Sequence, residues 1–230
     1  MQVDLIVPDK LSEITIGQYQ EFLEIKENNE GENHELNDFI IQKMVSIFCN
    51  VKMNYVAMMK LTDITDIFAT LNKIFEEKPQ HQLRFTLGNT EFGFIPNIEE
   101  ITMGEYVDLE NNISSWKDMH KAMAVMYRPI IKDLKGKYEI EKYNGTHNYS
   151  EVMKFAPVDI AMGAMLFFWT LNNELLQYTL DYLATETEQM ITAEKHNLGE
   201  NGAGLIQSIN SLRETSSYLK ELQDSNFTSV

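Results

Sequence analysis

The sequence contains few side chains at the spacings that catalysis or metal binding requires. None of its five histidines lies three or four residues from another, the spacing that places two ligands on one helix face, and no CxxC, HExxH or DxDxDG motif occurs. The sequence also lacks glycine-rich phosphate-binding motifs and a GxSxG nucleophile motif. We therefore expect no catalytic residues, no cofactor, no metal site and a protein that is not an enzyme.

Two other candidates for reactivity favour structural roles. The single cysteine, Cys49, lies in an apolar run with no basic neighbour to stabilise a thiolate, so we expect a buried thiol in a reducing cytoplasm. The adjacent pairs Glu76-Glu77 and Glu99-Glu100 are typical of solvated charges that complement helix dipoles, rather than of general acid–base pairs.

One cluster could recognise a ligand: Trp116, His120, Tyr127 and Arg128. Trp116 and His120 share a face if their segment is one helix, and Arg128 comes where that helix should end. Together these groups could bind a carboxylate or an aromatic group. The alternative, which we favour, is that Trp116 covers the core, His120 is a hydrogen-bonded residue at its edge, and Arg128 caps helix carbonyls.

The charge of the chain restricts its partners. It has 35 acidic and 19 basic residues and a formal net charge of -16. Specific nucleic-acid binding needs clustered Lys and Arg, so we expect none. The longest apolar stretch, Ile160 to Leu171, is far shorter than a membrane span, and the N-terminus lacks the pattern of a signal peptide. These features predict a protein that binds other proteins, away from membranes.

The segments that should position these residues contain an internal sequence repeat. Glu-Ile-Thr-Ile-Gly-Gln-Tyr at residues 13–19 matches Glu-Ile-Thr-Met-Gly-Glu-Tyr at residues 100–106. In each copy the Thr is a good helix N-cap, and the residue three positions later (Gln18 or Glu105) completes a capping box. Both stretches therefore predict the start of a helix of roughly 10–14 residues.

Two further pairs of segments also match each other in sequence. Residues 42–48 resemble residues 120–126, and Thr70-Leu71-Asn72 matches Thr170-Leu171-Asn172. Three matches in the same order favour an internally duplicated helix-pair unit. We expect a body at residues 1–156, with copy one at about 1–80 and copy two at about 92–156.

Two hairpins and a C-terminal arm complete the predicted fold, which is mainly α with two small β-hairpins (α+β). Runs of β-forming residues flank the turns Gly88-Asn89 and Lys135-Gly136. Residues 157–230 predict a long helix from Val158 to about Lys195, a glycine-containing break and a final amphipathic helix. That last helix could pack back as an antiparallel hairpin or lie on a partner chain.

Four stretches of the sequence resemble a family of virion-associated proteins of crAss-like phages, the short-tailed phages of gut Bacteroides. They begin at Ile6-Val7-Pro8-Asp9-Lys10, at Gly93-Phe94-Ile95-Pro96-Asn97, at Trp116-Lys117-Asp118-Met119-His120 and at Tyr138-Glu139-Ile140-Glu141-Lys142. The resemblance covers roughly residues 3–180. It implies a non-enzymatic structural component of a portal–tail assembly, a ring or internal tail protein. The alternative is a tail-assembly chaperone that is absent from the mature virion.

The resemblance implies contacts with portal or tail proteins, a homo-oligomer, synthesis in the host cytoplasm and a final place in the tail or neck of the virion. Exposed hairpins supply edge strands for such contacts, and an extended helix can reach a neighbour. We therefore predict that the interface lies on the second hairpin and the final helix, at Ile131, Lys132, Leu134, Lys137, Tyr138, Ile140, Tyr143, Leu205, Ile209, Leu212 and Leu219.

Overall fold

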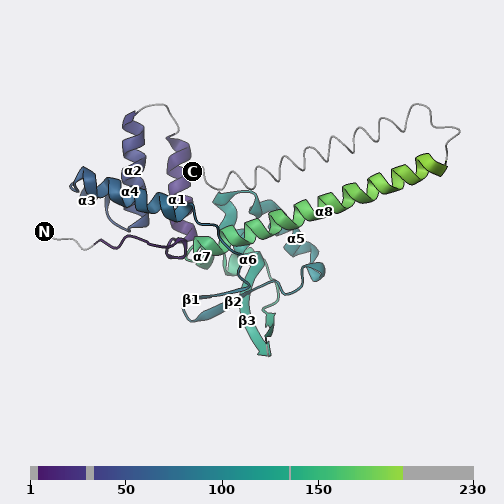
Figure 1. Ribbon diagram of the computed structural model, residues 1–230. Helices are drawn as coiled ribbons and strands as arrows, with labels where there is room; N and C mark the ends of the chain where they lie inside the picture. The colour runs from purple at the N-terminus through teal and green to yellow at the C-terminus, as the bar shows by residue number, and fades with distance from the viewer. Residues whose placement is uncertain (1–4, 30–33, 135, 194–230) are drawn as a thin grey trace. The chain divides into compact units, whose positions relative to one another are not determined.

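The computed structural model describes residues 5–29, 34–134 and 136–193 (Figure 1). Within these residues the fold is mainly helical α+β, with eight α-helices and one four-stranded antiparallel sheet, as the sequence predicts at this level. The helices are α1 (Ile16–Asn28), α2 (His34–Phe48), α3 (Met53–Val56), α4 (Leu61–Phe75), α5 (Met103–Ile113), α6 (Met119–Met126), α7 (Ser150–Met153) and α8 (Val158–Ala193). The strands are β1 (Arg84–Leu87), β2 (Thr90–Phe94), β3 (Tyr127–Leu134) and β4 (Lys137–Ile140).

Both predicted capping boxes are present. At α1, the backbone N–H of Gln18 donates to Thr15 Oγ1 at 3.2 Å, and the Thr15 N–H donates to Gln18 Oε1 at 3.0 Å. At α5, Thr102 and Glu105 make the same reciprocal pair at 3.3 and 2.8 Å. Because each box satisfies N–H groups that a helix leaves unpaired, both helices begin where the sequence predicts.

The first helices enclose an apolar core. The inward face of α4 follows from its sequence, because Ile64, Ile67, Leu71 and Ile74 recur at helical spacing and are all buried. α2 lies against both α1 and α4 (Figure 1). Aromatic rings from the three helices fill the space between them, in contacts that join Phe22 to Phe48, Phe48 to Phe75, and Phe75 to Tyr19.

The two predicted hairpins form one sheet, in the order β1-β2-β3-β4. The inner strands β2 and β3 pair, with Gly93 opposite Arg128 and Phe94 opposite Tyr127. β3 begins at Tyr127, directly after α6 and earlier than the predicted start at Ile130. The added length is the part of β3 that pairs with β2, so this long-range pairing extends the strand.

The start of α8 is tied to the N-terminal segment. The Val158 N–H donates to the Ile14 carbonyl at 2.8 Å, and the Ile16 N–H donates to the Ala156 carbonyl at 2.9 Å. These bonds surround an antiparallel bridge between Thr15 and Pro157. α8 therefore begins at Val158, as predicted, and it begins beside the capping box of α1.

The chain divides into two compact units, Met1–Met165 and Leu166–Val230, with the boundary inside α8. In the described residues, no helix combines the length and apolar character that a membrane crossing needs. The predicted glycine-containing break and the final helix, with Leu205, Ile209, Leu212 and Leu219, lie outside the described residues.

A glycine in α8 gives the first testable prediction. A Cβ at Gly163 would lie 2.4 Å from the backbone oxygen of Gln80, whereas a Cβ at Gly104 in α5 would meet nothing closer than Tyr143 Cε1 at 3.9 Å. Gly to Ala in a helix normally stabilises it by up to about 1 kcal/mol. We expect Gly163→Ala to lower the free energy of unfolding by about 1–3 kcal/mol, because the chain must shift to relieve the clash.

The control is Gly104→Ala, which should leave the protein as stable as the wild type or slightly more stable. Urea denaturation followed by circular dichroism measures both variants. A Gly163→Ala protein that is more stable than the wild type would contradict the close approach of α8 to Gln80.

Candidate functional site

The predicted interface on the second hairpin is partly exposed. Ile131 and Leu134 are 63% and 60% exposed, although both are large apolar residues. Lys132 and Lys137 are exposed beside them, and Lys132 Nζ lies 2.9 Å from Glu139 Oε1. β4 is a terminal strand of the sheet in the described part of the chain. The hairpin therefore presents apolar groups and lysines on an edge that can accept a neighbour.

The other three hairpin residues of that prediction are half-buried and make contacts within the fold. The Tyr138 hydroxyl lies 2.8 Å from the Phe94 carbonyl oxygen, to which it donates, and the Arg84 guanidinium lies 4.5 Å from the centre of the Tyr138 ring. The Tyr143 hydroxyl donates to the Asp108 carboxylate. Ile140 pairs with Ile130 across β3 and β4. Substituting these residues would disturb the fold as well as any interface.

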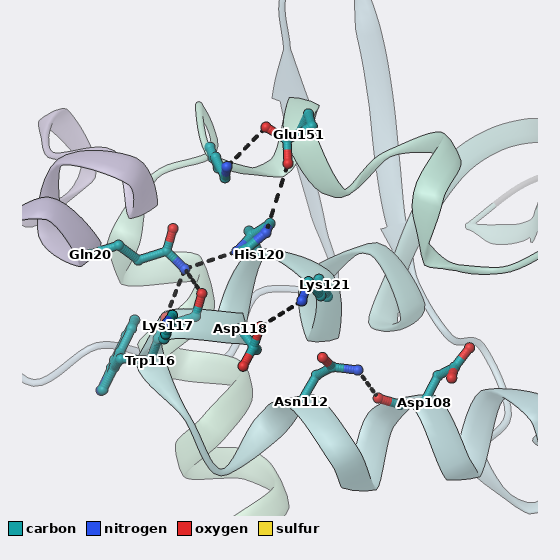
Figure 2. Close-up of polar contacts among 10 residues, drawn as sticks. Gln20, Asp108, Asn112, Trp116, Lys117, Asp118, His120, Lys121 and Glu151 are labelled. Carbon is teal, nitrogen blue, oxygen red and sulfur yellow. Dashed lines mark hydrogen bonds and ion pairs between the residues drawn. The ribbon is translucent and has the colours of Figure 1, made fainter. Parts of the chain in front are cut away.

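A groove of about 980 Å³ lies between α1 and the segment that precedes α6. Figure 2 shows the polar network at its base, where Gln20 of α1 reaches the residues around His120. Gln20 Nε2 donates to the Trp116 carbonyl at 2.7 Å and lies 3.0 Å from His120 Nδ1. Since an amide nitrogen only donates, Nδ1 accepts, and the neutral ring carries its proton on Nε2.

His120 is held in this neutral form. Its Nε2 faces Glu151 Oε1 at 4.0 Å, beyond hydrogen-bonding distance. Burial lowers the pKa of His120, and the positive charge of Lys154 adds to this effect. Glu151 is exposed and paired with Lys154 at 2.9 Å. The attraction between Glu151 and His120 therefore does not outweigh these effects, and the pKa of His120 stays below its ordinary value.

The two walls of the groove carry charges of opposite sign. α1 contributes Glu21, Glu24 and Glu27, and the opposite wall contributes Lys117, Lys121 and Lys154. Lys121 Nζ lies 2.6 Å from Asp118 Oδ1 (Figure 2), and Lys154 pairs with Glu151. Carboxylates thus neutralise two of the three lysines. The arrangement suits a contact with a mixed-charge protein segment better than the capture of a single anion.

Cys49 is buried, as predicted. Burial raises the pKa of the Cys49 thiol to about 11, so it remains protonated at neutral pH. No group of three or more His, Cys, Asp or Glu side chains in this part of the chain is placed to hold a metal ion.

The four residues predicted as one recognition cluster lie in two places. Trp116 belongs to a short 3-10 helix (Trp116–Asp118) and packs against the helical core, with its ring 4.6 Å from that of Tyr19. α6 begins only at Met119, so the prediction that Trp116 and His120 share a face of one helix was wrong. Tyr127 and Arg128 are buried in β3. The predicted contact of Arg128 with helix carbonyls is replaced by an ion pair.

The partner of Arg128 is Glu105, the capping-box residue of α5. Arg128 Nη1 lies 2.6 Å from Glu105 Oε1 as an ion pair rather than an aligned hydrogen bond, and both side chains are buried. The other carboxylate oxygen, Oε2, accepts from the Thr102 hydroxyl at 2.6 Å. Burial acts to raise the pKa of Glu105, but the hydrogen bonds from Thr102 and the charge of Arg128 outweigh it and lower the pKa.

Gln20 and Glu151, the polar neighbours of His120, were not predicted. Gln20 precedes His120 by 100 residues and Glu151 follows it by 31, and neither belongs to a motif. Comparisons of the chain with models of protein families, with curated proteins and with solved structures found no match.

The buried ion pair gives a second prediction. Arg128→Met leaves the Glu105 carboxylate buried without its cation, so we expect a loss of about 3–5 kcal/mol in the free energy of unfolding. The double variant Glu105→Gln/Arg128→Met buries no charge and should recover most of that loss, because Gln can still complete the capping box. Urea denaturation at pH 7 measures both.

The matched control is Lys132→Met, which breaks the exposed pair with Glu139. It should cost less than about 1 kcal/mol, because water already screens that pair. Equal losses for Arg128→Met and Lys132→Met would contradict the burial of the Glu105–Arg128 pair.

His120 gives a third prediction, on pH. Because its pKa is lower in the folded chain than the ordinary 6.5, the unfolded chain binds the proton first as the pH falls. This contribution to stability is complete above pH 6.5 and is lost below it. His120→Asn keeps an acceptor for Gln20 and removes the titration. We expect the variant to lose less stability than the wild type between pH 7 and pH 5, measured by urea denaturation, and equal slopes would contradict the burial of a neutral imidazole.

Proposed function

We propose that this protein is a non-enzymatic structural component of a bacteriophage portal–tail assembly, a ring or internal tail protein that acts through protein–protein contacts. The observation that carries the proposal is the exposed apolar pair Ile131 and Leu134 on the terminal hairpin of the sheet. Large exposed apolar side chains gain from burial against a neighbour. The resemblance of the sequence to virion-associated proteins indicates the kind of neighbour.

The side chains of the hairpin favour some partner surfaces over others. Lys132 of β3 and Lys137 of the terminal strand β4 flank the apolar pair, and a lysine on a terminal strand such as β4 disfavours indiscriminate strand pairing. They are also basic groups on a chain with a net charge of -16, so they favour a partner surface with apolar and acidic groups. The proposed partners are portal or tail proteins and further copies of this chain.

The acidic composition fits a place in the tail or neck of the virion. A surface with net negative charge offers the DNA backbone few cations to bind, so DNA can pass it without adhering. We therefore propose that the protein lines part of the channel through which the DNA passes, without binding nucleic acid specifically. The proposal also includes synthesis in the host cytoplasm before assembly.

We also propose that residues 1–156 contain a duplicated helix-pair unit. α1 and α5 both begin with a Thr-centred capping box, and each is followed by a helix that packs against it, α2 and α6 respectively. The copies have diverged after the second helix of each pair, since α2 leads to further helices and α6 leads directly into β3. The proposed copies are residues 1–80 and 92–156.

The experiment is quantitative mass spectrometry of purified phage particles. We expect several copies of the protein per particle. Its presence in infected cells but absence from particles would contradict a structural role and support a tail-assembly chaperone instead.

The hairpin is tested in the same particles with the double variant Ile131→Glu/Leu134→Glu. Both side chains are exposed, so we expect a change in unfolding free energy of no more than about 0.5 kcal/mol for each substitution, but at least a tenfold loss of incorporation. The control, Leu61→Glu, places the same charge on an exposed leucine of α4 and should be incorporated normally. Normal incorporation of the hairpin variant would exclude this edge as the contact.

A further inference from the structure

An exposed asparagine with glycine as the next residue follows the second hairpin. Asn144 comes shortly after β4 and precedes Gly145. The side-chain amide carbon of an asparagine can close a five-membered ring with the backbone nitrogen of the next residue. A glycine leaves that nitrogen least shielded, because it has no side chain. The Asn144-Gly145 step is therefore open to a spontaneous covalent change that other asparagines resist.

Neither of the two reacting groups is held elsewhere in the described part of the chain. The Asn144 side chain makes no hydrogen bond there, and the Gly145 N–H donates to no acceptor there. Asn112 shows the contrast. Its side-chain amide donates to the Asp108 carbonyl, and the bulky Ile113 follows it. The Asn144 side chain is thus free to turn toward Gly145, whereas that of Asn112 is fixed.

A basic side chain lies against the same step. The His147 ring fills the space that a side chain at position 145 would take, since a Cβ built on Gly145 would lie 2.9 Å from His147 Nδ1. Nδ1 is therefore within about 5.5 Å of the Gly145 nitrogen, a distance that a water molecule can bridge. His147 is exposed, so water reaches it. A neutral imidazole with its proton on Nε2 accepts a proton at Nδ1.

We propose that Asn144 is a site of spontaneous deamidation and that His147 accepts the proton which ring closure removes. The Gly145 nitrogen attacks Asn144 Cγ and forms a C–N bond, while its proton passes through water to His147 Nδ1. The bond from Cγ to the side-chain nitrogen then breaks, and this nitrogen takes up a proton and leaves as ammonia. Water opens the succinimide ring to aspartate or isoaspartate. The net reaction consumes a water molecule and releases ammonia, with no oxidation or reduction.

The product alters the surface that follows the second hairpin. The new carboxylate adds a negative charge to a chain whose formal net charge is already -16. An isoaspartate also adds an atom to the main chain between Tyr143, whose hydroxyl donates to Asp108, and the 3-10 helix Thr146–Asn148. The segment beside the hairpin therefore changes with the age of the protein. This chemistry does not rest on the proposed function.

The experiment incubates the purified full-length protein at neutral pH and follows each asparagine by peptide mass spectrometry. We expect Asn144 to gain about 1 Da as its amide becomes a carboxylate, while Asn112 stays unchanged. The variant His147→Gln keeps a polar side chain but cannot accept the proton, so deamidation at Asn144 should slow at least about threefold. The other Asn-Gly step of the sequence, Asn201-Gly202, is the internal reference and should react at the same rate in both proteins.

The ratio of the rates at Asn144 and Asn201 separates a local effect of His147 from a general one. Asn144 that stays intact while Asn201 reacts would overturn the site. An unchanged ratio in His147→Gln would overturn the role of His147, whether both rates fall or neither does. Circular dichroism spectra of the two proteins should coincide, since His147 is exposed. Absence of the protein from phage particles would contradict the proposed function and leave these rates unaffected.

Discussion

The buried pair of Glu105 and Arg128 is the constraint around which the sheet and its neighbouring helix are arranged. Both side chains are buried, and burying either charge without the other would cost several kcal/mol, on the order of 3–5. One carboxylate serves two elements, since Oε1 meets the Arg128 guanidinium of β3 while Oε2 completes the cap of α5. The start of α5 is thereby held beside the strand that joins the two hairpins, where Arg128 lies opposite Gly93 of β2.

The surfaces around this framework differ in charge and in exposed apolar area. The partly enclosed ring of His120 already accepts at Nδ1 from Gln20. Large apolar residues are instead exposed on the β3–β4 hairpin and along α8, where burial against another chain would gain free energy. The two surfaces have different chemistry. The hairpin combines apolar groups with lysines, whereas the exposed apolar residues of α8 stand among uncharged and acidic residues.

Predictions that depend on neighbouring residues in sequence are confirmed. The capping boxes at Thr15 and Thr102 and both hairpins are found, because each follows from contacts within a few residues. The start of α8 at Val158 is also as predicted, although bonds to the distant residues around Ile14 hold it. Predictions that needed distant partners were wrong or incomplete. Arg128 binds a carboxylate 23 positions earlier rather than carbonyls of the preceding turn. One local prediction was also wrong, since Trp116 and His120 do not share one helix.

The sequence by itself determined the local elements of this protein, its acidic character and the apolar spacing that buries one face of α4. Capping, turn geometry and side-chain periodicity are properties of short segments, so they can be read without knowing the fold. Only the tertiary structure decided that the hairpins share one sheet, that Gln20 meets Nδ1 of His120, and that Glu105 and Arg128 are buried together. Those outcomes depend on which distant segments meet, and the free energy of burying an apolar face or a charge exists only after they have met.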